Sequence, residues 1–398
     1  MRQATTQGPL AGVRVVDLTS VLSGPAAMGT LADQGADVIK VEPPAGDIMR
    51  GRGTLASISA GFVSCNRGKR SIVLDLKQTE ATEVLWELIA SADVVAQNFR
   101  PGAVERLGFG ADVVRARYPR VIYLSISGVG ESGPYAGKRV YDPVVQALSG
   151  LADIQADPQT GRPRMVRTLI ADKTTAIYAA QAVSAALFAR ERTGEGQHIR
   201  LSMLDTMVSY LWPEGMAPFA SVADDTQSAR ASKHDMIFPT ADGYITVGAV
   251  SDKEWHGLCA ALGRPEWLDD PRFRTGALRA QNRQERLELV EQALGVRDTA
   301  QVIAALEAAD VPCAPVHARR QVIDDPQVIA NSLVYEVDQP GIGVLRQARP
   351  AARFEGTPAE WPSLAPCLGE HTEEILAELG YESAQIAAMC ASGVASAS

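Results

Sequence analysis

The stretch VRVVDLTSVLSGPAAMG, residues 13–29, contains a complete strand–loop–helix unit. The run Val13–Leu18 is rich in β-branched residues, which predicts a buried strand, and Ser23 and Gly24 form a tight loop after it. Pro25 suits the first turn of a helix, whose N-terminus offers backbone N–H groups to an anion. We therefore expect a ligand site just beyond the carboxyl end of this strand.

The same alternation continues to about residue 200. Further β-branched runs occur at Asp37–Glu42, Ser71–Leu76, Asp93–Asn98 and Val121–Ser127, and segments with helical periodicity separate several of them. Alternating strands and helices predict an α/β fold with a parallel sheet. Ligands of such sheets bind beyond the carboxyl ends of the strands, so the residues that follow each run are the candidates for function.

The remainder of the chain predicts a second, smaller domain. We expect a large domain at 10–212, a linker at 213–233, a small α+β domain at 234–318, a return linker at 319–356 and a C-terminal segment at 357–398. In the small domain, MIFPTADGYITVGAV predicts two strands joined by a turn at Asp242 and Gly243. Helical patterns follow at 252–262, 282–294 and 299–309, and another occurs at 372–379.

Composition narrows the function classes. A chain of 398 residues that is 46% hydrophobic and 21% charged is typical of a globular protein. The net charge of -9 argues against a surface for nucleic acid or anionic membrane, and the sequence shows neither a signal peptide nor a transmembrane run. The 5 cysteines are scattered without CxxC pairs, which predicts a cytoplasmic protein with no zinc site. The histidines show no ligand spacing, so we expect no metal.

Positive and polar side chains follow several of the predicted strands. Lys77, Arg100, Arg106 and Arg139 are expected to converge on one edge of the sheet, where they would suit a ligand with several phosphates. The alternative is that each is an ordinary solvated surface cation. A dinucleotide is disfavoured because the first loop reads SVLSGPAAMG and lacks the GxGxxG pattern.

Asp172 lies in VRTLIADKTTAIYAAQAV, residues 166–183, just before a run of small and apolar side chains. Aspartate is a favoured helix N-cap, and its charge suits that end of the helix dipole. A carboxylate at the start of a buried helix is also a candidate for chemistry. The local sequence alone leaves both interpretations open.

Several motifs in order resemble those of the family III CoA-transferases, which include formyl-CoA and carnitine CoA-transferases and alpha-methylacyl-CoA racemase. The motifs are LAGVRVVDLTSVLSGP, GADVIKVEPPAGD, NRGKRSIVLDLK, NFRPGAVERLG, RTGEGQHIRLSMLD and LGEHTEEILAELG, and the likeness runs from about residue 9 to about residue 385. The resemblance implies a Rossmann-like large domain built from both chain ends, a small domain between them, and an interlocked homodimer.

The resemblance also implies roles for individual residues. Asp172 matches the catalytic aspartate that attacks the thioester of an acyl-CoA, and the acceptor is a small carboxylic acid. No tightly bound cofactor is implied, since coenzyme A enters as a substrate. The residues implied to contact coenzyme A are Leu74, Lys77, Asn98, Phe99, Arg100, Arg106 and Arg139, and those implied to line the acyl pocket are Ser20, Val21, Leu22, Ser23 and Tyr141.

The chain departs from two members of the family. Ser20 and Leu22 stand where formyl-CoA transferase has histidine and glutamine, and a glycine-rich loop is missing, so the pocket suits oxalate poorly. Tyr141 stands before Asp142 where the racemases have histidine, and tyrosine with its pKa of about 10 is a poor base for proton abstraction. Transfer of coenzyme A is favoured; a racemase or a non-catalytic CoA- or dinucleotide-binding protein are the alternatives.

Overall fold

The computed structural model describes residues 7–51, 58–222, 235–359 and 364–397. Residues 223–233 of the predicted linker, residue 234 of the predicted small domain, and residues 360–363 and 398 of the C-terminal segment lie outside this description. The chain divides into two compact units. The first comprises 1–155, 164–222 and 332–398, and the second comprises 156–163 and 223–331.

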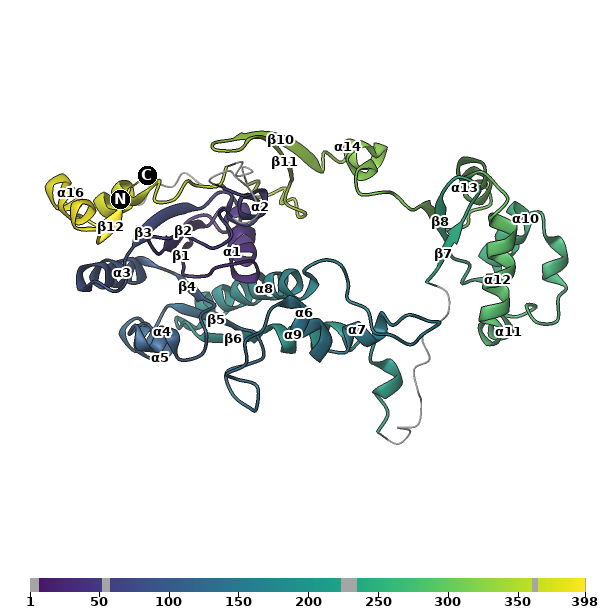
Figure 1. The fold of residues 1–398 in the computed structure, drawn as a ribbon, viewed down its shortest axis with the longest axis horizontal. Coiled ribbons are helices and arrows are strands. Elements are labelled where there is room, and N and C mark those ends of the chain that lie inside the picture. The colour runs from purple at the N-terminus through teal and green to yellow at the C-terminus, as the bar shows by residue number, and fades with distance from the viewer. Residues whose placement is uncertain (1–6, 52–57, 223–234, 360–363, 398) are drawn as a thin grey trace. The chain divides into compact units, whose positions relative to one another are not determined.

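A seven-stranded sheet forms the centre of the first unit, with the order β12-β3-β2-β1-β4-β5-β6 (Figure 1). The strands are β1 (Arg14–Asp17), β2 (Asp37–Glu42), β3 (Arg70–Leu74), β4 (Val94–Gln97), β5 (Ile122–Ser127), β6 (His198–Ser202) and β12 (Ala395–Ser396). Every neighbouring pair is parallel except β12, which runs antiparallel to β3. The predicted α/β class and parallel sheet are confirmed, whereas β6 and β12 were not predicted as strands.

The strand order places a ligand-binding crevice at a defined point of this sheet. The chain moves outward from β1 through β2 to β3, then returns to the other side of β1 and continues through β4, β5 and β6. In doubly wound sheets of this order, ligands bind where the direction reverses, beyond the carboxyl ends of the strands. Here that point lies between β1 and β4, so the segments that follow Asp17 and Gln97 border the crevice.

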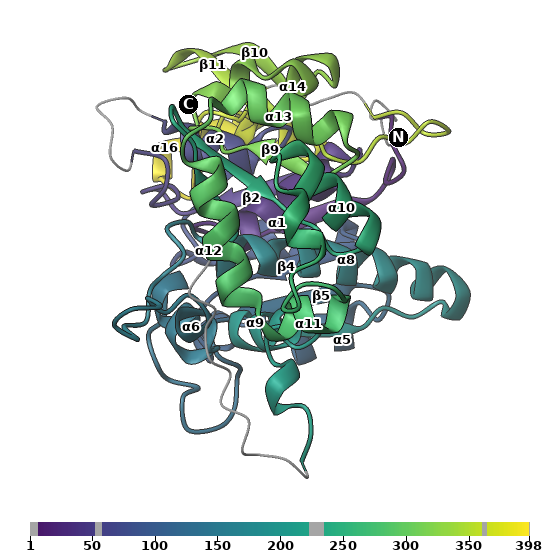
Figure 2. The same cartoon turned by 90° about the vertical axis from the view of Figure 1, so that its right-hand side faces the viewer.

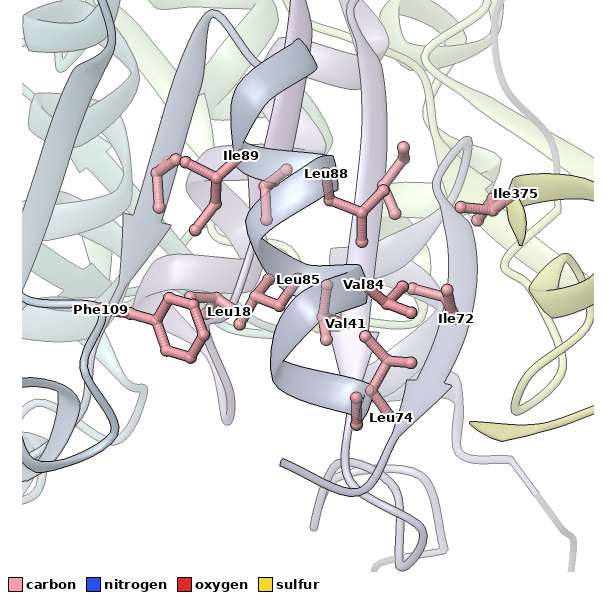
Figure 3. Packing of buried hydrophobic residues seen from close by; sticks show 14 of the residues in the cluster. Leu18, Val41, Ile72, Leu74, Val84, Leu85, Leu88, Ile89, Phe109 and Ile375 are labelled. Atoms are coloured by element: carbon pink, nitrogen blue, oxygen red, sulfur yellow. The ribbon is translucent and has the colours of Figure 1, made fainter. Parts of the chain in front are cut away.

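Each face of the sheet is covered by helices. Val16 and Val95 belong to the apolar cluster that includes α3, α5, α15 and α16, whereas Val15 and Val94 belong to the cluster formed with α1 and α8. Alternate residues of a strand point to opposite faces, which explains why these strands are apolar throughout. Figure 3 shows the α3 side chains Val84, Leu85, Leu88 and Ile89 beside strand residues such as Ile72 and Leu74.

The helices of the first unit connect and flank these strands. They are α1 (Ser23–Asp33), α2 (Ala60–Asn66), α3 (Thr79–Ser91), α4 (Ala103–Arg106), α5 (Ala111–Arg117), α6 (Asp142–Leu148), α7 (Leu151–Ile154), α8 (Ile170–Thr193), α9 (Met203–Leu211), the 3-10 helix η1 (Ala217–Phe219), α15 (Thr372–Glu378) and α16 (Ser383–Ser392). The alanines of α8 that are buried let this helix pack closely against α1.

Part of the segment predicted as a return linker is regular structure. Strands β10 (Val334–Gln339) and β11 (Gly343–Ala348) form an antiparallel hairpin in the first unit. The hairpin is tied to the rest of this unit, since Arg67 donates to the backbone carbonyl of Ala348 and Gln339 exchanges hydrogen bonds with the backbone of Ala365.

The second unit has its own sheet and core. Strands β7 (Ile237–Pro239), β8 (Tyr244–Val247) and β9 (Cys313–Pro315) form an antiparallel sheet. Its helices, several of which are labelled in Figure 2, are α10 (Asp252–Ala261), η2 (Pro265–Leu268), α11 (Gly276–Gln281), α12 (Arg283–Leu294), α13 (Thr299–Ala308), η3 (Gln321–Asp324) and α14 (Pro326–Ala330). Trp255, Trp267 and Phe273 pack together in its core. The two predicted strands and three predicted helices are present, and β9 was not predicted.

Candidate active site

A cavity of about 410 Å³ lies at the predicted edge of the sheet, in the first unit. It is bordered by the segments after β1, β4 and β5 and by the start of α8. The predicted site residues in its lining are Ser20, Val21, Ser23, Asn98, Phe99, Arg100, Arg139, Tyr141 and Asp172. The fold therefore brings together residues that are up to 152 positions apart in the chain, from Ser20 to Asp172.

The other predicted site residues lie elsewhere in the same unit. Leu22 precedes α1 as its N-cap residue, and Leu74 is 1% exposed within the core cluster, so any contact of Leu74 with a ligand would use its backbone. Lys77 and Arg106 are exposed on segments beyond β3 and at the end of α4. Of the four cations expected to converge, the cavity lining contains Arg100 and Arg139, and it adds Lys138.

Asp172 is the third residue of α8 rather than its cap. The helix begins at Ile170, after Leu169 as N-cap residue, so of the two interpretations left open for Asp172 the capping one is wrong. The turn before it is closed by a hydrogen bond from the Ile170 N–H to the Thr168 carbonyl at 2.9 Å. Its carboxylate is thereby left available for contacts outside its own first turn, while its negative charge still lies near the positive end of the helix dipole.

The carboxyl group of Asp172 has a pKa of about 6, well above its ordinary value of 3.8. Burial is the largest cause, and the negative charge of Asp142 adds to it. Hydrogen bonds from the hydroxyl and the backbone N–H of Ser23 act in the opposite direction, because they stabilise the ionised form. The group is ionised at neutral pH but is a stronger base than an exposed aspartate.

Asp142 is a functional candidate that the sequence reasoning missed. It is the first residue of α6, is 1% exposed, and accepts a hydrogen bond from the Asp172 backbone N–H at 3.1 Å. Its other carboxylate oxygen accepts from Gln146 at 2.6 Å. The motif YDP, with proline in the first helical turn, signals a helix start at this position. The sequence did not show that this start meets the start of α8.

The turn after β1 is fastened to the segment after β4 across the crevice. Asn98 accepts from the Ser20 backbone N–H at 2.9 Å and donates to the Ser20 carbonyl at 2.8 Å. Asn98 thus pairs with both backbone groups of one residue. Phe99 packs on the core cluster and also lines the cavity, so the two roles considered for it are compatible.

A second hollow of about 300 Å³ shares Phe99 and Arg100 with the first. Together with Lys138 and Arg139, Arg100 gives this region of an acidic protein a local positive charge. Guanidinium groups bind phosphate oxygens in pairs, and an elongated phosphorylated ligand would fit such an arrangement.

The site thus offers a basic carboxylate, hydrogen-bond donors at a helix start and exposed cations. Among the residues that the structure describes, His, Cys, Asp and Glu form no group of three suited to a metal ion. None of the helices within the described ranges combines the length and apolarity needed to span a bilayer.

Comparison with known proteins gives one consistent result. Residues 10–372 match the family described as CoA-transferase family III. The chain is 34% identical over 395 residues to the succinyl-CoA:glutarate CoA-transferase of Mus musculus, covering 97% of this chain and 90% of that protein. It is 33% identical to the formyl-CoA:oxalate CoA-transferase of Streptomyces coelicolor, covering 98% and 100%. The crystal structure of a CAIB/BAIF family protein from Brucella suis is 34% identical, with a TM-score of 0.81 over 94% of this chain and 100% of that one.

Proposed function

Since this chain belongs to the family III CoA-transferases, as the resemblance in its motifs indicated, we propose that it moves coenzyme A from an acyl-CoA to a free carboxylic acid with Asp172 as nucleophile. The observation that carries the proposal is the Asp172 carboxylate itself. It lines the cavity, is partly buried beside Asp142, and has a pKa raised to about 6. A raised pKa makes an ionised carboxylate more nucleophilic than an ordinary surface acid.

The reaction proceeds through two kinds of covalent intermediate. A carboxylate oxygen of Asp172 attacks the thioester carbon, the C–S bond breaks, and coenzyme A leaves as a thiolate, which yields a mixed anhydride between Asp172 and the donor acid. The thiolate then attacks the Asp172 carbonyl carbon, which releases the donor acid as a carboxylate and leaves an aspartyl-CoA thioester. The acceptor carboxylate attacks this thioester and again expels the thiolate. Attack of the thiolate on the acceptor acyl carbon gives the new acyl-CoA and regenerates Asp172.

The neighbouring residues support these steps. The Ser23 N–H and hydroxyl contact the nucleophile, and Asn98, Phe99, Arg100 and Arg139 are proposed to hold coenzyme A; Lys77, Arg106 and Leu74 remain predicted contacts. Ser20, Val21 and Tyr141 would border the acyl group. Exchange between two carboxylates conserves one thioester, so no external energy source is required. An anhydride is easily hydrolysed, so partial burial of Asp172 favours transfer by limiting water.

Covalent capture tests the proposal directly. The protein is mixed with succinyl-CoA and glutarate, and in parallel with formyl-CoA and oxalate, the pairs named for its relatives. Hydroxylamine or borohydride then traps the activated carboxyl group, and mass spectrometry locates the modified peptide. We expect modification at Asp172, with none in Asp172→Asn, while Asp205→Asn on the exposed side of α9 reacts normally. Modification at another residue, or transferase activity in Asp172→Asn, would contradict the proposal.

Solvent exchange distinguishes transfer from racemisation. Tyr141 is 69% exposed at the start of α6, and an ordinary phenol is a poor base for a carbon acid. We therefore expect no deuterium at the α-carbon of an acyl-CoA incubated in D2O without an acceptor acid. Rapid incorporation of deuterium would favour the racemase.

We further propose that the enzyme acts as a homodimer. Ile177 and Phe188 lie three turns apart on the same face of α8 and are 68% and 64% exposed, so contact with a second subunit would bury both. Light scattering is expected to give twice the chain mass of 42.4 kDa. The interlocked arrangement, the bounds of the five predicted segments and the cytoplasmic location remain predictions from the sequence.

A further inference from the structure

The turn that precedes α1 has a strained backbone. Val21 has a φ angle of 72°, in the left-handed region that a β-branched residue rarely adopts. The conformation is tight as well as strained, because a Cβ atom on Gly24 would lie 2.4 Å from the Thr19 Cβ. Strained residues of this kind persist only where the surrounding structure fixes them, and they are concentrated at functional sites.

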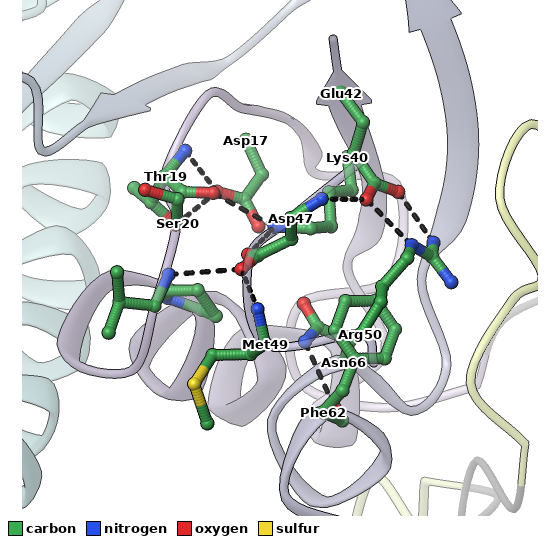
Figure 4. A network of polar contacts seen from close by, with 12 residues as sticks. Asp17, Thr19, Ser20, Lys40, Glu42, Asp47, Met49, Arg50, Phe62 and Asn66 are labelled. Carbon is green, nitrogen blue, oxygen red and sulfur yellow. Dashed lines mark hydrogen bonds and ion pairs between the residues drawn. The ribbon is translucent and has the colours of Figure 1, made fainter. Parts of the chain in front are cut away.

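Buried charged side chains hold this turn through hydrogen bonds to its backbone (Figure 4). Lys40 donates to the Thr19 carbonyl at 2.8 Å and to Asp47 at 3.0 Å. The other oxygen of Asp47 accepts from the backbone N–H groups of Val21, at 3.4 Å, and of Met49, at 2.9 Å. The side chains of Lys40 and Asp47 are 0% and 1% exposed, so solvent contributes little to their pairing.

A second buried pair holds the two ends of the same turn. Asp17 accepts from both the backbone N–H and the hydroxyl of Thr19 and pairs with Lys69 at 2.8 Å. Lys69 also donates to the carbonyl of Pro25, in the first turn of α1. Each residue from Thr19 to Val21 therefore has a backbone group hydrogen-bonded to a side chain. Lys40 binds Thr19, Asn98 binds Ser20, and Asp47 binds Val21.

A contribution to stability alone is a weak reason for such a network. Removing two charges from water costs about as much as their mutual attraction returns, so an apolar pair of the same volume is often equally stable. An apolar pair, however, could not bind the carbonyl of Thr19 and the N–H of Val21. The hydrogen bonds to the turn are what the ion pair adds.

We propose that Lys40 and Asp47 are positioning residues that fix the turn Thr19–Ser23 so that Ser23 meets the Asp172 carboxylate; the inference rests on the proposed function of Asp172. Neither residue belongs to the cavity lining, and both act through the backbone of the turn. The buried pair keeps the strained turn in place before substrate arrives, so the donors at the start of α1 need no rearrangement during attack.

The test replaces the pair by apolar residues of similar size, as Lys40→Met with Asp47→Leu. The matched control is Arg67→Met with Asp33→Leu, which removes another shielded ion pair, with side chains 11% exposed, at the opposite end of α1. We expect kcat of the first variant to fall by about 10-fold or more while KM for acyl-CoA changes by less than about 3-fold. The control is expected to keep kcat within about 3-fold of the unaltered enzyme.

A pH profile separates positioning from loss of stability. Ser23 lowers the pKa of Asp172, so release of the turn should raise that pKa and move the acid limb of kcat/KM to higher pH. The other charged groups near Asp172 are Asp142 on α6, Lys173 on its own helix, and Arg100, Lys138 and Arg139 in the cavity lining, and none of them is altered. A structural defect alone would lower the amount of active enzyme without moving the limb.

The outcomes are distinguishable. If the unaltered enzyme is trapped at Asp172 but the double variant keeps its kcat and acid limb, this inference is wrong and the proposed function stands. If Asp172 is not trapped, the proposed function itself is wrong. Should the double variant not fold, Asp47→Asn is used, because either orientation of the amide places an N–H against the Lys40 ammonium or the Val21 N–H. If neither the double variant nor Asp47→Asn folds while the control variant does, the Lys40–Asp47 pair is needed for folding itself, and the inference is overturned.

Discussion

The reactivity of Asp172 should follow its own ionisation. Since its pKa is about 6, we expect kcat/KM to fall about 10-fold for each pH unit below that value and to level off above it. Asp142 raises this pKa by charge repulsion, so Asp142→Asn should move the acid limb to lower pH. A pH–rate profile of both enzymes, with the amount of active enzyme measured by trapping, checks the prediction. A limb at pH 4 in the unaltered enzyme would show that the carboxylate is not perturbed.

The same ionisation should cost the folded protein stability. A carboxyl group whose pKa is raised on folding destabilises the folded state once it is ionised, above a pH of about 6, and does not do so below about 4, where it is protonated in both states. We therefore expect Asp172→Asn to raise the free energy of unfolding by about 1–2 kcal/mol at pH 8. The gain should vanish at pH 4. Urea unfolding at the two pH values measures it, and an equal gain at both would contradict the ionic explanation.

Single residues show how far the sequence could lead. Local rules left Asp172 open between a helix cap and a reactive carboxylate, and the resemblance then favoured the reactive role. The capping interpretation is wrong because the helix already begins at Ile170, with Leu169 as its N-cap residue. Asp142 lies 30 positions before Asp172, and only the folded chain brings the two together.

At the scale of elements, the close approach at the start of α1 is the feature most sensitive to substitution. A Cβ on Gly24 would fall within 2.7 Å of three atoms of the Thr19 side chain, including its Cβ, which cannot swing away. We expect Gly24→Ala to lower the free energy of unfolding by about 1–3 kcal/mol and to reduce kcat by displacing Ser23. Gly248→Ala has open space around it and, like Gly24, no positive φ, so it controls for the glycine-to-alanine change without the steric clash. Equal effects of the two substitutions would refute the steric explanation.

The elements that sequence periodicity predicted are those with a clear burial pattern. Strand β2 has the predicted bounds, because five of its six residues are buried. Strand β6 has the pattern HIRLS at the edge of the sheet, with one buried residue, and β12 has only two residues. The hairpin β10–β11 does carry a signal, since Pro340 and Gly341 separate two runs of alternating burial. Its place in the fold depends on distant partners such as Arg67.

At the scale of the whole molecule, charge is divided unevenly. The chain carries a net charge of -9, yet the cavity lining contains Arg100, Lys138 and Arg139. The net negative charge of the protein repels an anionic substrate such as acyl-CoA, while the cations of the cavity lining attract it. Local attraction dominates at short range because a cleft concentrates the field of the charges that line it.

Salt should therefore weaken the binding of acyl-CoA by screening these cations. We expect KM for acyl-CoA to rise several-fold between about 20 mM and about 200 mM NaCl, over which the Debye length falls from about 20 Å to below 10 Å. An acyl thioester of N-acetylcysteamine, which has the reacting group but no phosphates, should show no such change. Arg100→Gln with Arg139→Gln should raise KM for acyl-CoA at low salt and flatten its salt dependence, while Arg192→Gln on the exposed end of α8 should leave both unchanged. If KM for acyl-CoA is independent of salt, or if the two thioesters respond alike, the cations of this cavity do not bind the phosphates of coenzyme A.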